Sequence, residues 1–456
     1  MNDWKLAKLS AAPMCVVLAA SPAAADLVLD WNALACDVLV ADTELQNPGM
    51  ASRNLAMLNL ALHDGLALTT PSFGSSFYGY GSTASALGQT ADRNVAMAAA
   101  AHTVMAGSYV GHTSMMSPLL DQTLAATPDG LGKTDGLALG QLIGNSILAN
   151  RANDGWDTSV QYTHTNEPGH WQPDPVNPGQ EAWGPAWGSV ATFALSSPSS
   201  FAPPAMPDLT SQEYADAFNE VRSLGSVDST TRTDEQTEIG LFWAYDREGM
   251  GTPMRLYNQA LSTIAVQEGN TLEENAELFA KAAVATADAG VVAWRSKFEH
   301  DFWRPVTGIR EADTDGNPLT VADPDWTPLG APDDDGGVGF TPPFPTYLSG
   351  HATFGGAIFG ALQEFYGTDD ISFLLASEEL GGLERSFDSF SEAMAENGRS
   401  RVYLGIHWNF DDTEAQIVGD NIAAAVFASP FVAIPEPTFG IAVFCAAGLL
   451  VRRRRN

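Results

Sequence analysis

Cysteine is scarce in this sequence, with only three among 456 residues. Cys15 lies in the N-terminal stretch and Cys445 near the C-terminus, so the body of the chain keeps only Cys36. A single thiol cannot form an internal disulfide, which excludes a disulfide-stapled fold. We expect Cys36 to be a buried core residue.

Positive charge is also scarce, because 22 Lys and Arg face 55 Asp and Glu and leave a net charge of −33. The only dense basic run is Arg452–Arg455 at the extreme C-terminus, so binding of nucleic acid is not expected. The acidity suits a protein that works outside the cell, and it repels anions at long range. Any anion-binding site in this chain must therefore be locally basic.

Alternating apolar and polar runs, which are typical of strands, are absent, and so are internal repeats. The chain is long and apolar enough for one large core, and the class predicted is all-α. The region from Tyr162 to Pro207 is rich in proline and tryptophan and is expected to be a long ordered loop. Apolar spacing predicts helices at about 53–68, 91–110, 140–151, 211–223, 233–245 and 271–294.

Both ends of the chain carry export features. Residues 1–25 have a charged start, a short apolar run and a small-residue cleavage site, as in a secretory signal peptide. Residues 435–456 combine Pro-Glu-Pro, a 14-residue apolar run (Thr438–Val451) and an arginine cluster, and they resemble the PEP-CTERM sorting signal of Gram-negative bacteria. The resemblance implies export and sorting machinery as partners, transient membrane contact through the tail, and a location in the periplasm, on the outer surface or in the extracellular matrix. The domain between these ends is predicted to span 26–429.

The central stretch of the chain runs from Thr341 to Phe365. Its first half is too rich in proline to be helical, whereas its second half has helical apolar spacing. Ser349, Gly350 and His351 therefore lie at a helix N-terminus, where free N–H groups and the helix dipole favour an anion. His351 can move a proton near neutral pH.

Two further segments supply cations and a histidine–carboxylate pair. Lys297 and Arg304 are separated by six residues, and Arg401 is followed by His407 and Asp411. Asp411 lies one helical turn after His407 and can fix the orientation of its ring. Three cations beside a helix N-terminus describe a cage for a tetrahedral oxyanion.

Taken in order, Lys-x6-Arg-Pro, Ser-Gly-His and Ser-Arg-x5-His-x3-Asp resemble the three-part signature of the type 2 phosphatidic acid phosphatase and vanadium haloperoxidase superfamily. Leu348 departs from the family's usual proline before Ser-Gly-His. The stretches 294–305, 325–332 and 342–356 are similar to the chloroperoxidase branch of the vanadium haloperoxidases. The resemblance covers nearly the whole mature chain and implies two packed four-helix bundles with the active site at their centre.

The resemblance implies vanadate as cofactor and a role for each matching residue. His407 would be the ligand to vanadium, oriented by Asp411, and His351 would accept a proton from hydrogen peroxide. Lys297 would also make the bound peroxide electrophilic toward halide, giving hypohalous acid that reacts with a small organic acceptor. The residues implied to hold the vanadate oxygens are Lys297, Arg304, Ser349, Gly350 and Arg401.

The same cage also suits phosphate, so a secreted acid phosphatase with His407 as nucleophile is the first alternative. A non-catalytic surface or matrix protein is the second, because the sorting tail does not require enzymatic activity.

The residues expected beside the cage are apolar. Phe344 lies seven residues before His351, where bromoperoxidases have histidine, and Trp294 is expected next to it. An apolar wall lowers the local dielectric and strengthens the action of Lys297 on bound peroxide. We therefore expect oxidation of bromide and of some chloride at mildly acidic pH.

The two terminal signals generate a first prediction. Protein secreted by its native host should lack residues 1–25, because cleavage is expected after Ala25, and should also have lost the C-terminal sorting segment. Mass spectrometry of the secreted protein measures both ends. Recovery of an intact cytoplasmic chain that begins at Met1 would contradict this prediction.

Overall fold

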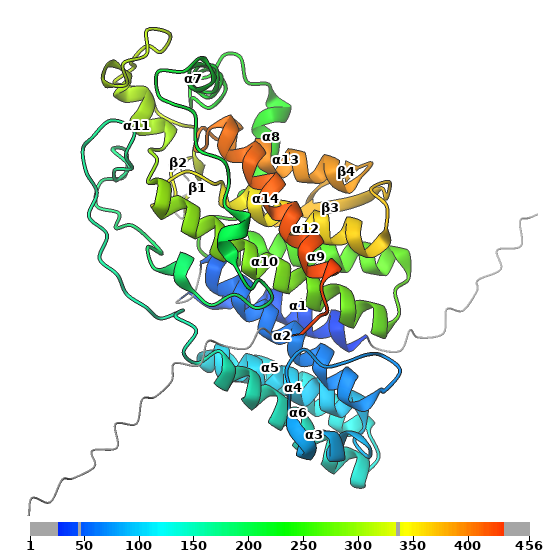
Figure 1. Cartoon of the computed structure of the whole chain (residues 1–456). Helices are drawn as coiled ribbons and strands as arrows, with labels where there is room; N and C mark the ends of the chain where they lie inside the picture. Colours follow the sequence, from blue (N-terminus) through cyan, green and yellow to red (C-terminus); the bar gives the residue numbers. More distant parts are fainter. Residues whose placement is uncertain (1–25, 44–46, 334–337, 433–456) are drawn as a thin grey trace, which may run out of the picture.

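The computed structural model describes residues 26–43, 47–333 and 338–432, and these ranges are mainly helical (Figure 1). The predicted signal peptide and sorting tail lie outside the described residues. None of the helices in these ranges is both long and apolar enough to cross a membrane. The helices are α1 Leu27–Ala41, α2 Pro48–Thr69, α3 Gly81–Gly88, α4 Arg93–Ser108, α5 Thr113–Ala126, α6 Leu131–Asn150, α7 Gln212–Leu224, α8 Asp234–Phe242, α9 Thr252–Glu268, α10 Leu272–His300, α11 Pro305–Arg310, α12 Gly350–Tyr366, α13 Phe390–Tyr403 and α14 Asn409–Ala428.

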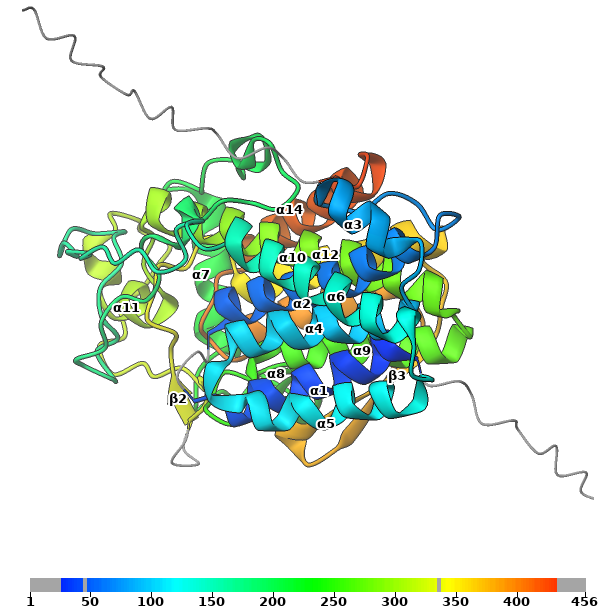
Figure 2. The same ribbon diagram turned by 90° about the horizontal axis from the view of Figure 1, so that it is seen from below.

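The helices pack in two groups, in agreement with the all-α prediction. Helix α4 packs against α2, α5 and α6, and this group forms the lower part of the molecule in Figure 1 and the near side in Figure 2. Helix α12 packs against α10, α13 and α14 in the second group. The two groups meet where α10 packs along α2.

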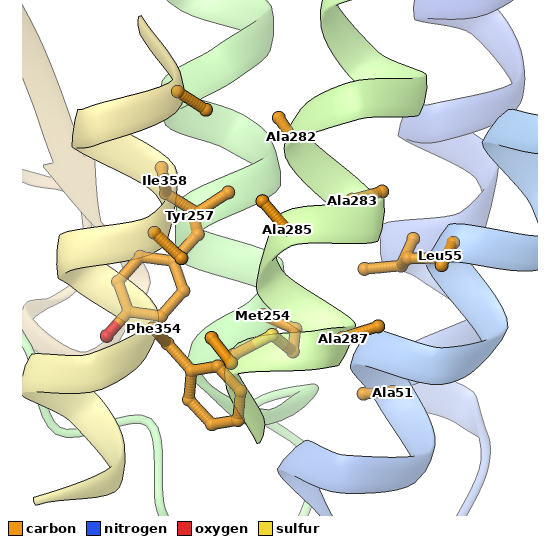
Figure 3. Packing of buried hydrophobic residues seen from close by; sticks show 14 of the residues in the cluster. Ala51, Leu55, Met254, Tyr257, Ala282, Ala283, Ala285, Ala287, Phe354 and Ile358 are labelled. Carbon is orange, nitrogen blue, oxygen red and sulfur yellow. The ribbon is translucent and has the colours of Figure 1, made fainter. Parts of the chain in front are cut away.

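Helix α10 is the central element of the core. It begins at a capping box in which Thr271 and Glu274 satisfy each other's backbone N–H groups. Its buried alanines lie between α2 on one side and α9 and α12 on the other (Figure 3), so small side chains let three neighbours approach closely. The helix continues to His300, beyond the predicted end near Trp294, and its last turn therefore carries Lys297.

Helices α12 and α14 cross at glycines. A Cβ atom on Gly419 of α14 would lie 2.2 Å from the carbonyl oxygen of Thr353 on α12. A Cβ atom on Gly356 would likewise lie 2.5 Å from the carbonyl oxygen of Gln416. The backbones are therefore in direct contact, which holds the N-termini of the two helices close together.

The segment between α6 and α7 has no helix longer than a short 3₁₀ turn, yet it is firmly attached along one side of the molecule (Figure 1). The carboxylate of Asp288 on α10 is fully buried and accepts hydrogen bonds from the backbone N–H groups of Phe193, Ala194 and Leu195 at 2.6–2.9 Å. Nearer its start, the N–H of Trp171 donates to the carbonyl of Asp301. The segment is ordered, as its tryptophan content predicted.

Two small antiparallel hairpins depart from the prediction that strands are absent. Strand β1 Ala331–Pro332 pairs with β2 Val338–Phe340, and β3 Phe373–Ser377 pairs with β4 Leu383–Phe387. Residues of β3 alternate between buried and exposed. The exposed position Leu374 is itself apolar, so the sequence conceals the alternation.

The glycine crossing generates a second prediction. Gly419→Ala should lower the free energy of unfolding by about 1–3 kcal/mol, because the methyl group forces the α12 and α14 backbones apart. Gly79→Ala is the control, since a Cβ there meets nothing within 4 Å, and its effect should stay below about 0.5 kcal/mol. Urea unfolding measures both, and equal stability of the two variants would contradict the prediction.

Candidate active site

The N-terminus of α12 lies at the centre of the predicted site. Ser349 is its N-cap and accepts a hydrogen bond from the N–H of Ala352, as the sequence predicted. The Ser349 N–H donates to the carbonyl of Asp411 at 3.1 Å, which ties the start of α12 to the start of α14. The N–H groups of Gly350 and His351 belong to the first turn, where no intrahelical acceptor exists, and are suited to an anion.

Lys297 is fully buried beneath the loop that leads into α12. Its ammonium group donates to the carbonyl oxygens of Pro345, Thr346 and Leu348 and lies 4.9 Å from the centre of the Phe344 ring. An ammonium has three donors, so all of them are occupied by the backbone. Lys297 thus fixes this loop, and its direct contact with an anion stays a prediction.

Arg304 is 1% exposed and reaches the site from the end of the α10–α11 connection. Its Nε donates to the Phe344 carbonyl at 2.9 Å, and its Nη1 donates to the Ile406 carbonyl at 2.8 Å. Nη1 also lies 2.9 Å from Nε2 of His407. The remaining nitrogen, Nη2, is buried and has no hydrogen-bond partner among the described residues.

Arg401 projects from the last turn of α13 and is also buried. Its Nη2 forms an ion pair of 2.6 Å with Asp246. Its Nε and Nη1 are buried without a partner in the part of the chain that the structure describes. Sequence reasoning missed Asp246, which belongs to no motif and lies 155 residues before Arg401 in the chain.

His407 and Asp411 form the predicted pair. The Nδ1 of His407 lies 2.9 Å from Oδ2 of Asp411, which also accepts hydrogen bonds from the Thr346 hydroxyl and the Trp408 N–H. Nδ1 therefore carries the proton, and the lone pair on Nε2 faces Arg304. Thr346 was also missed, because a hydroxyl three residues before Ser349 gives no distinctive sequence signal.

His351 is a buried residue of the first turn of α12. Its Nε2 is 2.9 Å from the carbonyl of Ala244, so Nε2 carries a proton and the lone pair of the neutral ring is on Nδ1. Its own carbonyl accepts from Tyr257 and Asn397, which fixes the first turn of α12. Burial, together with the charge of Arg401, lowers the pKa of His351 to about 4.

Burial of like charges dominates the electrostatics of the cluster. It lowers the pKa of Arg304 to about 9 and that of Lys297 well below its ordinary value, with the neighbouring arginines adding to the effect. The pKa of His407 is lowered for the same reasons, so its ring is neutral at pH 7. Burial raises the pKa of Asp411 to about 7, although hydrogen bonds to its carboxylate act in the opposite direction. An anion in the cage would offset the repulsion among the cations.

A cavity of about 240 Å³ opens beside this cluster. Its lining includes Gly350, His351, Arg401 and His407, together with Asp246. The predicted neighbours Trp294 and Phe344 both line the cavity, and their ring centres are 5.1 Å apart. The remaining wall is largely apolar and is lined by Pro48, Trp183, Tyr245, Pro253, Phe340, Pro342, Pro343 and Phe354.

Together these features define a mainly helical protein with a buried cluster of three cations and two histidines at the junction of two helix N-termini. Comparison with known proteins agrees with this class. Residues 277–432 match the family model of the VCPO second helical-bundle domain. The vanadium chloroperoxidase of Curvularia inaequalis is 31% identical over an alignment that covers 82% of this chain and 76% of that protein. The chain therefore belongs to the vanadium chloroperoxidase family.

Solved structures share the fold. A bacterial vanadium-dependent iodoperoxidase superposes with a TM-score of 0.73 at 24% identity, covering 88% of this chain and 96% of that one. A holo-type bacterial vanadium-dependent chloroperoxidase superposes with a TM-score of 0.62 at 16% identity, covering 86% of this chain and 92% of its own. These likenesses extend the fold assignment to almost the whole described chain.

The environment of His351 generates a third prediction. In anion-free protein its ring should titrate near pH 4, below the ordinary value of 6.5. As the pH falls, the unfolded chain binds this proton at a higher pH than the folded protein does. The free energy of unfolding is therefore unaffected by this group above pH 6.5 and decreases as the pH falls from 6.5 toward 4. Added vanadate or phosphate should raise the pKa, because it neutralises Arg401.

Histidine ring NMR across a pH series measures this value, and His351→Gln assigns the signal. A titration at the ordinary value that is insensitive to either anion would contradict the prediction.

Proposed function

We propose that this chain is a vanadate-dependent haloperoxidase that oxidises halide with hydrogen peroxide to hypohalous acid. The observation that carries the proposal is the set of buried, unpartnered guanidinium N–H groups on Arg304 and Arg401, next to the N-terminus of α12. Buried donors without acceptors are unfavourable, so the site is built for an anion. Membership of the vanadium chloroperoxidase family supports vanadate as that anion.

The donor set fits vanadate, an oxyanion with the same tetrahedral form as phosphate. Arg304, Ser349, Gly350 and Arg401 would hold its oxygens, Lys297 would add its positive charge from beneath the loop, and Nε2 of His407 would be the ligand to the metal. When bound, vanadate supplies a Lewis-acidic centre that activates hydrogen peroxide. Phosphate suits the same donors and is expected to compete with vanadate.

The protein's own groups are set for proton movement and ligation. His407 is neutral, and its Nδ1–H is held by Asp411, so its Nε2 lone pair is aimed at the cage. His351 is neutral with its lone pair on Nδ1, so it can accept a proton from hydrogen peroxide that enters the cavity. Asp246 holds Arg401 in place by an ion pair, which leaves two of its nitrogens for the anion.

The proposal extends to the location of the protein. We infer export through residues 1–25, processing within 435–456 and a catalytic domain at 26–429. Both terminal segments lie outside the described residues, so the support for them comes from the sequence.

Replacement of the ligating histidine generates a fourth prediction. His407→Ala should abolish binding of vanadate and halide oxidation, because it removes the Nε2 lone pair that would ligate the metal. Asp411→Ala should reduce vanadate affinity by about 10–100-fold, since it removes orientation and not the ligand. His164→Ala, an exposed histidine, is the matched control and should retain both properties.

The experiment combines metal analysis after vanadate loading with peroxide-dependent oxidation of iodide, bromide and chloride. Hydrolysis of p-nitrophenyl phosphate is measured in parallel. Full halide oxidation by His407→Ala would overturn the assignment of the ligand. Phosphate-ester hydrolysis without halide oxidation by wild type would favour the acid phosphatase. If wild type shows neither activity, the non-catalytic matrix protein is favoured.

A further inference from the structure

The cavity beside the cage is larger than its proposed inorganic substrates require. Its volume is about 240 Å³, whereas an apolar protein cavity of about 150 Å³ already binds benzene. Hydrogen peroxide and a halide ion are both much smaller than an aromatic ring. The cavity therefore has space for an organic molecule in addition to the species that react at the cage.

Trp183 forms a wall of this cavity that no sequence motif indicated. Its ring centre lies 5.1 Å from that of Trp294, with the rings 86° apart, and 6.2 Å from that of Phe344 at 65°. Trp294 and Phe344 are themselves in contact, so the three rings form one aromatic cluster. Edge-to-face contacts of this kind are favourable, and an aromatic molecule in the cavity can make further contacts of the same kind with the cluster.

The wall is held in place by backbone contacts. The N–H of Trp183 donates to the carbonyl of Pro343 at 2.8 Å. Gly184 has φ +76°, and a Cβ there would lie 2.7 Å from Nε1 of Trp294, so the backbone lies directly on that ring. A Cβ on Gly188 would lie 2.4 Å from the Cα of Arg295, so the same segment also rests on α10. These contacts fix the position of Trp183 relative to Trp294 and to the loop at Pro343.

The geometry points to Trp183 as a specificity-determining residue that, with Trp294 and Phe344, binds an electron-rich aromatic acceptor of one or two rings next to the oxyanion cage. This inference rests on the proposed haloperoxidase function. Hypohalous acid released from the cage meets the bound acceptor before it reaches solvent. The halogen–oxygen bond breaks, a carbon–halogen bond forms, and the displaced aryl proton joins the hydroxide as water.

Binding is tested first, on vanadate-loaded protein without peroxide, by isothermal titration calorimetry with 2-naphthol as the probe. Wild type should bind it saturably at one site, and Trp183→Leu should weaken binding by about tenfold, because an aromatic contact is replaced by a smaller aliphatic one. Trp156→Leu is the control, because Trp156 lies on the same segment, contacts Arg53 and does not line the cavity. It should bind like wild type.

The turnover arm follows bromination of 2-naphthol in the presence of taurine, a polar scavenger of free hypohalous acid. Wild type and Trp156→Leu should keep a taurine-resistant fraction of product. Trp183→Leu should lose most of it, and its ratio of naphthol bromination to iodide oxidation should fall by about tenfold.

Three outcomes would overturn the inference: no saturable binding by wild type, equal binding by Trp183→Leu, or complete diversion of product to taurine in wild type. Iodide oxidation is measured in the same preparations and reports on the proposed function separately. Saturable binding without halide oxidation would reject the haloperoxidase function and leave an aromatic site.

Discussion

Repulsion among three buried cations is the constraint on which the site depends. Lys297, Arg304 and Arg401 are each almost completely removed from solvent, and the negative charge that Asp246 and Asp411 offer nearby only partly balances them. The protein compensates with carbonyl oxygens, which occupy every donor of the lysine and two nitrogens of Arg304. A small set of guanidinium N–H groups is left without acceptors among the described residues, and these are the groups that we propose hold the oxyanion. The proline-rich loop is thus as much a part of the anion site as the cations.

The parts of this arrangement that are local in sequence could be predicted. The change from proline-rich loop to helical spacing placed Ser349 and Gly350 at a helix start, and the i, i+4 spacing placed Asp411 against His407. The all-helical class followed from the lack of alternating runs. The cation cluster was indicated by the order of three motifs, which identifies the family but does not show how the side chains are hydrogen-bonded.

The rest depends on contacts between distant segments. Asp246 meets Arg401 only because α8 and α13 pack together, and no local pattern distinguishes it from the other acidic residues of a strongly acidic chain. Trp183 was expected to lie in an ordered loop, but the partner of that loop was not predictable from composition. Helices α1, α3, α5, α9, α11 and α14 were not predicted. The short strand β3 was missed because one of its exposed positions is apolar.

Helix α10 carries both the anchor of the α6–α7 segment and the lysine of the site. Asp288 and Lys297 are nine positions apart on one rigid helix, a rise of about 13 Å. Helix α10 therefore fixes the position of the segment that supplies Trp183 relative to Lys297. The segment itself contributes no side chain to the proposed cage. Trp183, which we propose as a determinant of acceptor binding, therefore lies on a different stretch of chain from the cations of the cage. A substitution at Trp183 can therefore change the wall of the cavity without replacing any side chain of the cage.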